Sequence, residues 1–176
     1  MSFLTHVTRS LLRVVILAHD GSLAKSIHGA SVAAQAVYVE HVGTIGSALR
    51  VIGRLSATAL VGQFDFASAD VRSLIATLRD PTRTPAPHIV MVAVTPSLSR
   101  QQVVTIVRMG VDQVVVPPHT VERISSRIAA AWRSPVPNVA TPTYVGPCRR
   151  RAPDDVYDGP RRRSQEQEKA PDPIEV

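Results

Sequence analysis

Between residues 12 and 133, short apolar runs alternate with longer segments in which apolar residues recur at helical spacing. The apolar runs are rich in valine, isoleucine and alanine, and they predict strands at residues 13–18, 37–42, 57–62, 88–94 and 113–116. In the segments that follow these runs, apolar residues recur every three or four positions, which predicts helices at 22–34, 43–55, 69–79, 99–109 and 121–132. Five strands are therefore expected to alternate with five helices.

In the third strand segment, "ATALVG" (57–62), Thr58 is the one polar side chain, and such an apolar run is typical of a strand that is buried on both faces of a sheet. Strands that alternate with helices through short connections predict a parallel sheet with helices on both faces. Because such crossovers are right-handed, few arrangements remain. We expect a doubly wound, flavodoxin-like α/β fold, with five parallel strands in the order 2-1-3-4-5.

Polar residues at the ends of the predicted helices indicate where these helices begin and stop. Ser22 and Thr120 are placed to cap the first and last helices, and Gly110 is placed to end the fourth. On the fourth helix, Val103, Val104 and Val107 are expected to face the core.

The composition changes at residue 134. Eight of the 14 prolines lie in the last 43 residues, together with runs of arginine and little apolar periodicity. This pattern predicts a Pro/Arg-rich disordered tail over residues 134–176. The chain is thus divided into an N-terminal extension (1–11), one folded domain (12–133) that ends near Trp132, and this tail.

The net charge of +6 lies in the predicted domain, because residues 1–133 hold 13 Lys/Arg against 7 Asp/Glu, whereas residues 134–176 hold 7 of each. A basic domain raises the possibility of a nucleic-acid-binding module. However, the arginines are scattered singly, and few aromatic residues are available to stack on bases. An acidic protein partner is the preferred interpretation, and nucleic acid stays an alternative.

Several classes of protein are disfavoured by the sequence. No apolar run approaches the ~20 residues that cross a bilayer, and no signal peptide is evident, so we expect a cytoplasmic protein with no membrane partner. The single cysteine, Cys148, provides neither a disulfide framework nor a thiolate metal site. No Gly-rich phosphate-binding loop follows the first strand, and the six histidines are dispersed, so neither a cofactor nor a metal site is expected.

Four segments carry a resemblance to a known family: "HDGSLAKSI", "ALVGQFDFASADVRSLIATLR", "HIVMVAVTPS" and "MGVDQVVVPP". In this order they resemble the receiver domain of bacterial response regulators, over residues 12–133. The resemblance implies an aspartate at the end of the third strand that accepts a phosphoryl group, and two acidic residues after the first strand that hold Mg²⁺. It also implies a Thr or Ser after the fourth strand and a Lys-Pro pair after the fifth, which contact the phosphoryl oxygens.

The acidic positions of the family are not matched in this chain. Ala18 and His19 stand where the resemblance places the acidic pair, and Asp20 follows one position late. Gln63 stands at the phosphoacceptor position, and an amide cannot be phosphorylated in this chemistry. Asp65, two residues later, could replace it only as a displaced acceptor.

The remaining two positions match in part. Thr95 corresponds to the family's hydroxyl after the fourth strand. Pro117 stands where the lysine belongs, whereas Pro118 matches the family's cis-type proline. The scaffold is therefore expected to be retained and the phosphorylation chemistry lost, giving a pseudo-receiver that is not an enzyme and acts by protein–protein interaction in bacterial signalling or assembly.

Two alternatives stay open. One is an active single-domain response regulator that is phosphorylated on Asp65, with Asp20 as the acidic partner and Mg²⁺ as cofactor. The other is the basic nucleic-acid-binding module. In the family, the face formed by the fourth helix, fifth strand and fifth helix commonly mediates dimerisation or output, so the resemblance implies either an acidic partner or a homodimer contact there. The residues expected on this face are Arg100, Gln101, Arg108, Gln113, Arg123 and Arg127.

Overall fold

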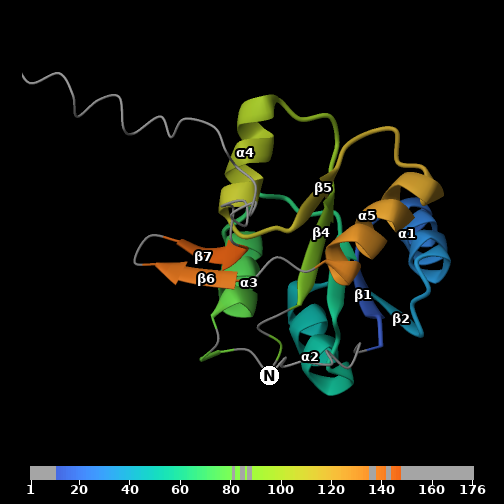
Figure 1. Ribbon diagram of the computed structural model, residues 1–176, viewed down its shortest axis with the longest axis horizontal. Coiled ribbons are helices and arrows are strands. Elements are labelled where there is room, and N and C mark those ends of the chain that lie inside the picture. Colours follow the sequence, from blue (N-terminus) through green and yellow to red (C-terminus); the bar gives the residue numbers. More distant parts are fainter. Residues whose placement is uncertain are drawn as a thin grey trace, which may run out of the picture.

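A computed structural model of the chain describes residues 11–80, 82–83, 86, 89–134, 138–141 and 144–147. Its main sheet is parallel and has the order β2-β1-β3-β4-β5, as predicted (Figure 1). The strands of this sheet are β1 (Arg13–Leu17), β2 (Tyr38–Val42), β3 (Ala59–Gly62), β4 (Val90–Val94) and β5 (Gln113–Val115). The flavodoxin-like α/β fold is confirmed.

Helices cover both faces of this sheet (Figure 1). One face carries α1 and α5, which pack against each other, and the other carries α2, α3 and α4. The helix bounds are α1 (Gly21–Ala33), α2 (Ile45–Leu55), α3 (Ala69–Arg79), α4 (Arg100–Arg108) and α5 (Val121–Arg133). Each bound lies within two residues of its prediction from the sequence.

Two hydrophobic cores form because successive strand residues point to opposite faces of the sheet. On β1, Val14 and Ile16 pack in the core beneath α1 and α5, whereas Val15 and Leu17 pack beneath α2, α3 and α4. These four side chains are at most 3% exposed. Burial of each such side chain contributes about 1.5–3 kcal/mol, so the apolar runs that predicted the strands also hold the two layers of helices in place.

Two local predictions are wrong. Helix α1 is capped by Asp20 rather than Ser22, because the Asp20 carboxylate accepts hydrogen bonds from the backbone N–H groups of Ser22 (2.6 Å) and Leu23 (3.1 Å). On α4, Ile106 is the buried residue and Val104 is 41% exposed, so the core-facing stripe is rotated relative to the prediction.

A second, two-stranded sheet follows α5. Strands β6 (Asn138–Thr141) and β7 (Tyr144–Pro147) pair in antiparallel fashion, and β7 contacts α3 (Figure 1). This hairpin lies in the segment for which the sequence predicts disorder, so that prediction does not hold for residues 138–141 and 144–147. Trp132 packs against the core beneath α1 and α5 as expected, and residues 148–176 lie outside the described residues.

Among the described residues, none of the helices combines the length and the apolar character that a bilayer crossing needs.

Candidate functional site

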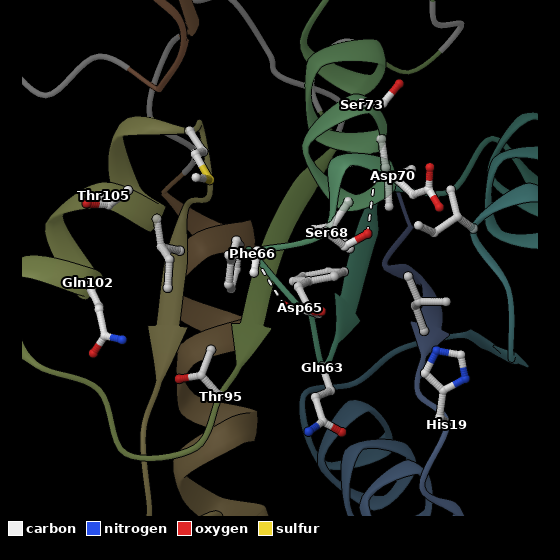
Figure 2. Close-up of a pocket in the computed structure, with 18 of the residues that line it drawn as sticks. His19, Gln63, Asp65, Phe66, Ser68, Asp70, Ser73, Thr95, Gln102 and Thr105 are labelled. Atoms are coloured by element: carbon white, nitrogen blue, oxygen red, sulfur yellow. Dashed lines mark hydrogen bonds between the residues drawn. The ribbon is translucent and has the colours of Figure 1, made fainter.

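The carboxyl ends of β1, β3 and β4 meet at one edge of the sheet, where an open groove of about 1440 Å³ runs between α2, α3 and α4. His19, Gln63 and Thr95, which follow these three strands, all line the groove (Figure 2). The topology therefore brings together the positions that the resemblance to receivers singled out, at the place where ligands of parallel sheets bind.

Gln63 stands directly after β3, where the resemblance to receivers implies the phosphoacceptor. Its backbone N–H donates a 3.0 Å hydrogen bond to the carbonyl of Leu17, which fixes the end of β3 beside β1. The preceding residue, Gly62, is buried and packs so closely against β1 that a Cβ there would overlap the Leu17 carbonyl oxygen. Gln63 is exposed and is among the residues that line the groove, so an uncharged amide side chain stands where the resemblance places a carboxylate.

Asp65 is exposed and also lines the groove, but its carboxylate takes part in the local turn. One carboxylate oxygen accepts a 3.0 Å hydrogen bond from the backbone N–H of Ala67, just before α3 begins. The same loop is held from the helix side, since Arg72 donates to the carbonyls of Phe66 (3.2 Å) and Ala67 (2.8 Å). The Asp65 carboxylate therefore stabilises the turn before α3 through its hydrogen bond with the Ala67 backbone.

The end of β1 does not provide the acidic pair of a receiver. Ala18 is buried, and its carbonyl oxygen lies 2.9 Å from Nε2 of His41. Exposed His19 lines the groove, whereas Asp20 caps α1 and is not among the residues that line it. Within the described part of the chain, no group of three or more His, Cys, Asp or Glu side chains is placed to hold a metal ion. Residues at this edge therefore do not fit a receiver-type Mg²⁺ site, which needs several carboxylate oxygens.

Thr95 is 2% exposed, and its hydroxyl is 3.4 Å from the carbonyl of Val115, to which it donates. The Thr95 backbone N–H donates to the same carbonyl at 3.0 Å. On the other side, Nε2 of His119 lies 2.8 Å from the Thr95 carbonyl oxygen. These three contacts tie the end of β4 to β5 and to the segment before α5. His119 was not singled out from the sequence, although its place directly after two prolines is a signal.

Pro117 and Pro118 follow β5 and are joined by a cis peptide bond, as the resemblance implies for Pro118. Both residues are exposed, and neither belongs to the groove lining. The position to which the resemblance assigns a phosphoryl-binding lysine is thus occupied by an uncharged residue, Pro117.

The predicted interaction face lies on adjacent elements, since β5 contacts both α4 and α5. Arg127 on α5 donates a 3.3 Å hydrogen bond to the half-buried amide of Gln113 on β5. Arg100 and Arg108 are exposed on α4, and Arg123 is exposed on α5. The sixth residue, Gln101, is exposed and is among the residues that line the groove.

Comparisons with solved structures identify the fold. The chain is similar to a response regulator from Hahella chejuensis, with 17% identity and a TM-score of 0.55, over 69% of this chain and 92% of that one. It is also similar to an orphan response regulator of H. pylori, with 15% identity and a TM-score of 0.56, over 71% and 99% of the two chains.

A third similar structure is a proposed pilus assembly protein from Burkholderia thailandensis, with 18% identity and a TM-score of 0.55, over 70% of this chain and 100% of that one. Neither a family model nor a curated protein matches the sequence. At these identities the comparisons show that the chain has the receiver fold.

Proposed function

We propose that this chain is a receiver-like signalling or assembly module that acts by protein–protein contact, without aspartyl phosphorylation and without an enzymatic activity of its own. The observation that carries the proposal is Gln63, an amide residue at the carboxyl end of β3 that lines the groove. Phosphoryl transfer to a receiver needs an ionised oxygen nucleophile at this position, and an amide does not supply one.

The surroundings of Gln63 support the same conclusion. A phosphorylated aspartate is stabilised by positive charge on its oxygens. Here Pro117 replaces the cation, Ala18 and His19 replace the Mg²⁺-binding carboxylates, and the hydroxyl of Thr95 donates to a backbone carbonyl of β5. Together with Gln63, these are positions at which the residues that receiver chemistry needs are replaced or engaged elsewhere, which supports the proposal.

The surface of α4, β5 and α5 favours an acidic partner over a homodimer. Arg100, Arg108, Arg123 and Arg127 are all exposed there, and Glu122 is the one acidic residue in the described α4 and α5. In a two-fold dimer each face meets its own copy, so arginines would lie opposite arginines. Like charges across an interface are unfavourable, whereas an acidic surface would be attracted from a distance.

The phosphorylation claim is tested by incubating the full chain with Mg²⁺ and either acetyl phosphate or beryllofluoride. We expect neither a mass increase on Asp65 nor a spectroscopic change that depends on Mg²⁺. Asp65→Asn provides the matched control, because it removes the candidate acceptor and keeps the side-chain oxygen that accepts from Ala67. Labelling of the native chain that needs Mg²⁺ and disappears in Asp65→Asn would overturn the proposal in favour of an active response regulator.

The interaction face is tested with the triple variant Arg100→Glu, Arg108→Glu and Arg123→Glu. Proteins retained by the native chain from its own cells should be lost from this variant. The control is Lys25→Glu with Arg50→Glu, which reverses two exposed charges on α1 and α2 and should leave retention unchanged. Equal retention by all three chains would refute the assignment of the face. Retention of nucleic acid that falls steeply with salt would instead favour the nucleic-acid alternative.

A further inference from the structure

Helix α4 presents a basic–apolar–basic stripe to solvent. Arg100, Val104 and Arg108 are spaced four residues apart, so they lie on one side of the helix, and all three are exposed. With a rise of 1.5 Å per residue, the Cα atoms of the two arginines are about 12 Å apart, with the valine between them. Val103 and Val107 are half-buried beside this stripe, so the apolar centre continues toward the core.

The two arginines of this stripe have no acidic partner within the described part of the chain. Neither an ion pair nor a side-chain hydrogen bond engages the guanidinium groups of Arg100 and Arg108 there, and α4 itself contains no acidic residue. By contrast, Arg54, Arg72 and Arg79 elsewhere in the domain each have partners. An occupant of this stripe therefore needs acidic groups at its ends and an apolar group in the middle.

The C-terminal sequence contains such a segment. The segment "SQEQEKAPDPIEV" (164–176) contains four acidic residues and a single lysine, and in its sequence Ile174 stands between Asp172 and Glu175. In a polyproline II backbone, which has three residues per turn and rises ~3.1 Å per residue, side chains three apart lie on the same side of the chain and about 9 Å apart, close to the ~12 Å between the arginines of the stripe. Prolines before and after Asp172 favour this backbone, which lowers the entropy lost on binding.

A second acidic segment provides a comparison. Asp155 and Asp158 have the same spacing and enclose Val156 and Tyr157, but arginine triplets stand on both sides, at 149–151 and 161–163. Each triplet lies three residues from the nearest aspartate. This separation is about one Debye length at physiological salt, so the arginines act on the same surface as the aspartates. The triplets would be repelled by a basic face, so residues 172–175 are the better occupant.

The chain is long enough for this contact. Strand β7 ends at Pro147 against α3, and α3 and α4 line the same groove. Twenty-five residues separate Pro147 from Asp172, which gives a maximum reach of roughly 80 Å. This reach is several times the diameter of a helix with its side chains, about 10–12 Å, so residues 172–175 can reach the exposed side of α4.

We propose that residues 172–175 bind in cis to the stripe formed by Arg100, Val104 and Arg108, and that the chain thereby occupies its own interaction face. Asp172 and Glu175 pair with the two arginines, and Ile174 covers Val104. An intramolecular segment has an effective concentration up to the millimolar range, so pairing with a Kd below about 1 mM keeps the stripe mostly covered. The regulatory consequence rests on the proposed function of this face: an acidic partner has to displace the tail before it binds.

The test compares the valine methyl NMR signals of three full-length chains: the native protein, Asp172→Asn with Glu175→Gln, and Asp155→Asn with Asp158→Asn. We expect the Val104 signal to move in the first variant, and the native signal to move in the same direction at high salt. The second variant is the matched control and should give the native signal. All substitutions lie outside the folded domain, so signals from the buried valines of β4 should stay unchanged.

Three results would overturn the proposal: a Val104 signal that is the same in the native chain and in Asp172→Asn with Glu175→Gln, a change confined to the control variant, or a native signal that changes on dilution. The last result would indicate that the segment binds a second copy. None of these measurements needs a partner. The tail contact can therefore be refuted while the triple Arg→Glu variant still shows that the face binds a partner. If both hold, Asp172→Asn with Glu175→Gln should also bind the partner severalfold more tightly.

Discussion

The guanidinium of Arg79 and the carboxylate of Asp112 form a 2.5 Å salt bridge in which the Arg79 side chain is 2% exposed. Arg79 also donates to the carbonyls of Gly110 (2.9 Å) and Ile89 (2.7 Å), and the backbone N–H of Met91 donates to Asp112 at 2.7 Å. The end of α3 is thereby tied to the start of β4 and to the connection between α4 and β5. This network fixes the side of the domain that carries the groove and α4.

Arg79→Met should lower the free energy of unfolding by about 3–5 kcal/mol, because it leaves a partly buried carboxylate without its cation. The carbonyls of Gly110 and Ile89 would also lose their donors, which adds to the cost. Denaturant unfolding followed by circular dichroism measures this change.

Arg83→Met is the control for that measurement. Arg83 and Asp80 form a 3.6 Å pair in which the arginine side chain is 68% exposed. A solvated pair of this kind contributes little to stability, so this variant should unfold close to the native protein. Equal losses in the two variants would contradict the role assigned to the buried network.

The fold could be predicted because its signals are local. Each strand is a short apolar run and each helix has its own apolar stripe, as on α3, where Val71, Leu74, Ile75 and Leu78 are all buried. Some residues of the groove could also be predicted, because the resemblance to receivers assigned them to the carboxyl ends of parallel strands, which meet at one edge of the sheet. Gln63 and Thr95 could therefore be placed together although 32 residues separate them.

The remaining features depend on contacts that no local pattern encodes. Arg79 and Asp112 are 33 residues apart and meet only in the folded chain. On α4, valines at positions 103, 104 and 107 lie around Ile106, so the apolar pattern did not show that Ile106 would be buried and Val104 exposed. The β6–β7 hairpin was missed because its proline-rich surroundings resemble a disordered tail.

Gly62→Ala should destabilise the protein by about 2–3 kcal/mol or more, because the added Cβ would clash with the Leu17 carbonyl oxygen and push β1 and β3 apart. Gly46→Ala is a suitable control. Gly46 lies in α2, and a Cβ added there would meet no atom within 4 Å, so alanine should stabilise the helix by about 0.5–1 kcal/mol. Thermal unfolding of both variants measures the contrast, and a Gly62→Ala protein as stable as the native one would refute the close approach.

Thr95→Val should cost about 1 kcal/mol of stability and leave partner binding unchanged, because the hydroxyl serves only a long hydrogen bond to the Val115 carbonyl. Unfolding by denaturant gives the first quantity and a partner titration the second. If the variant kept its stability but lost its partner, the hydroxyl would instead be a ligand of the groove.

Restoring the missing charges should restore phosphorylation, provided that the scaffold is retained. In the triple variant Gln63→Asp, His19→Asp and Pro117→Lys, two carboxylates enter the groove and a lysine precedes Pro118. The carboxylates supply oxygen ligands for Mg²⁺, and the lysine offsets phosphoryl charge. We expect labelling of residue 63 by acetyl phosphate that depends on Mg²⁺, measured by intact-mass spectrometry. Gln63→Asp alone should label far more slowly, since it lacks both cations. If the single and triple variants label equally fast, the losses at His19 and Pro117 do not explain why the native chain is inert.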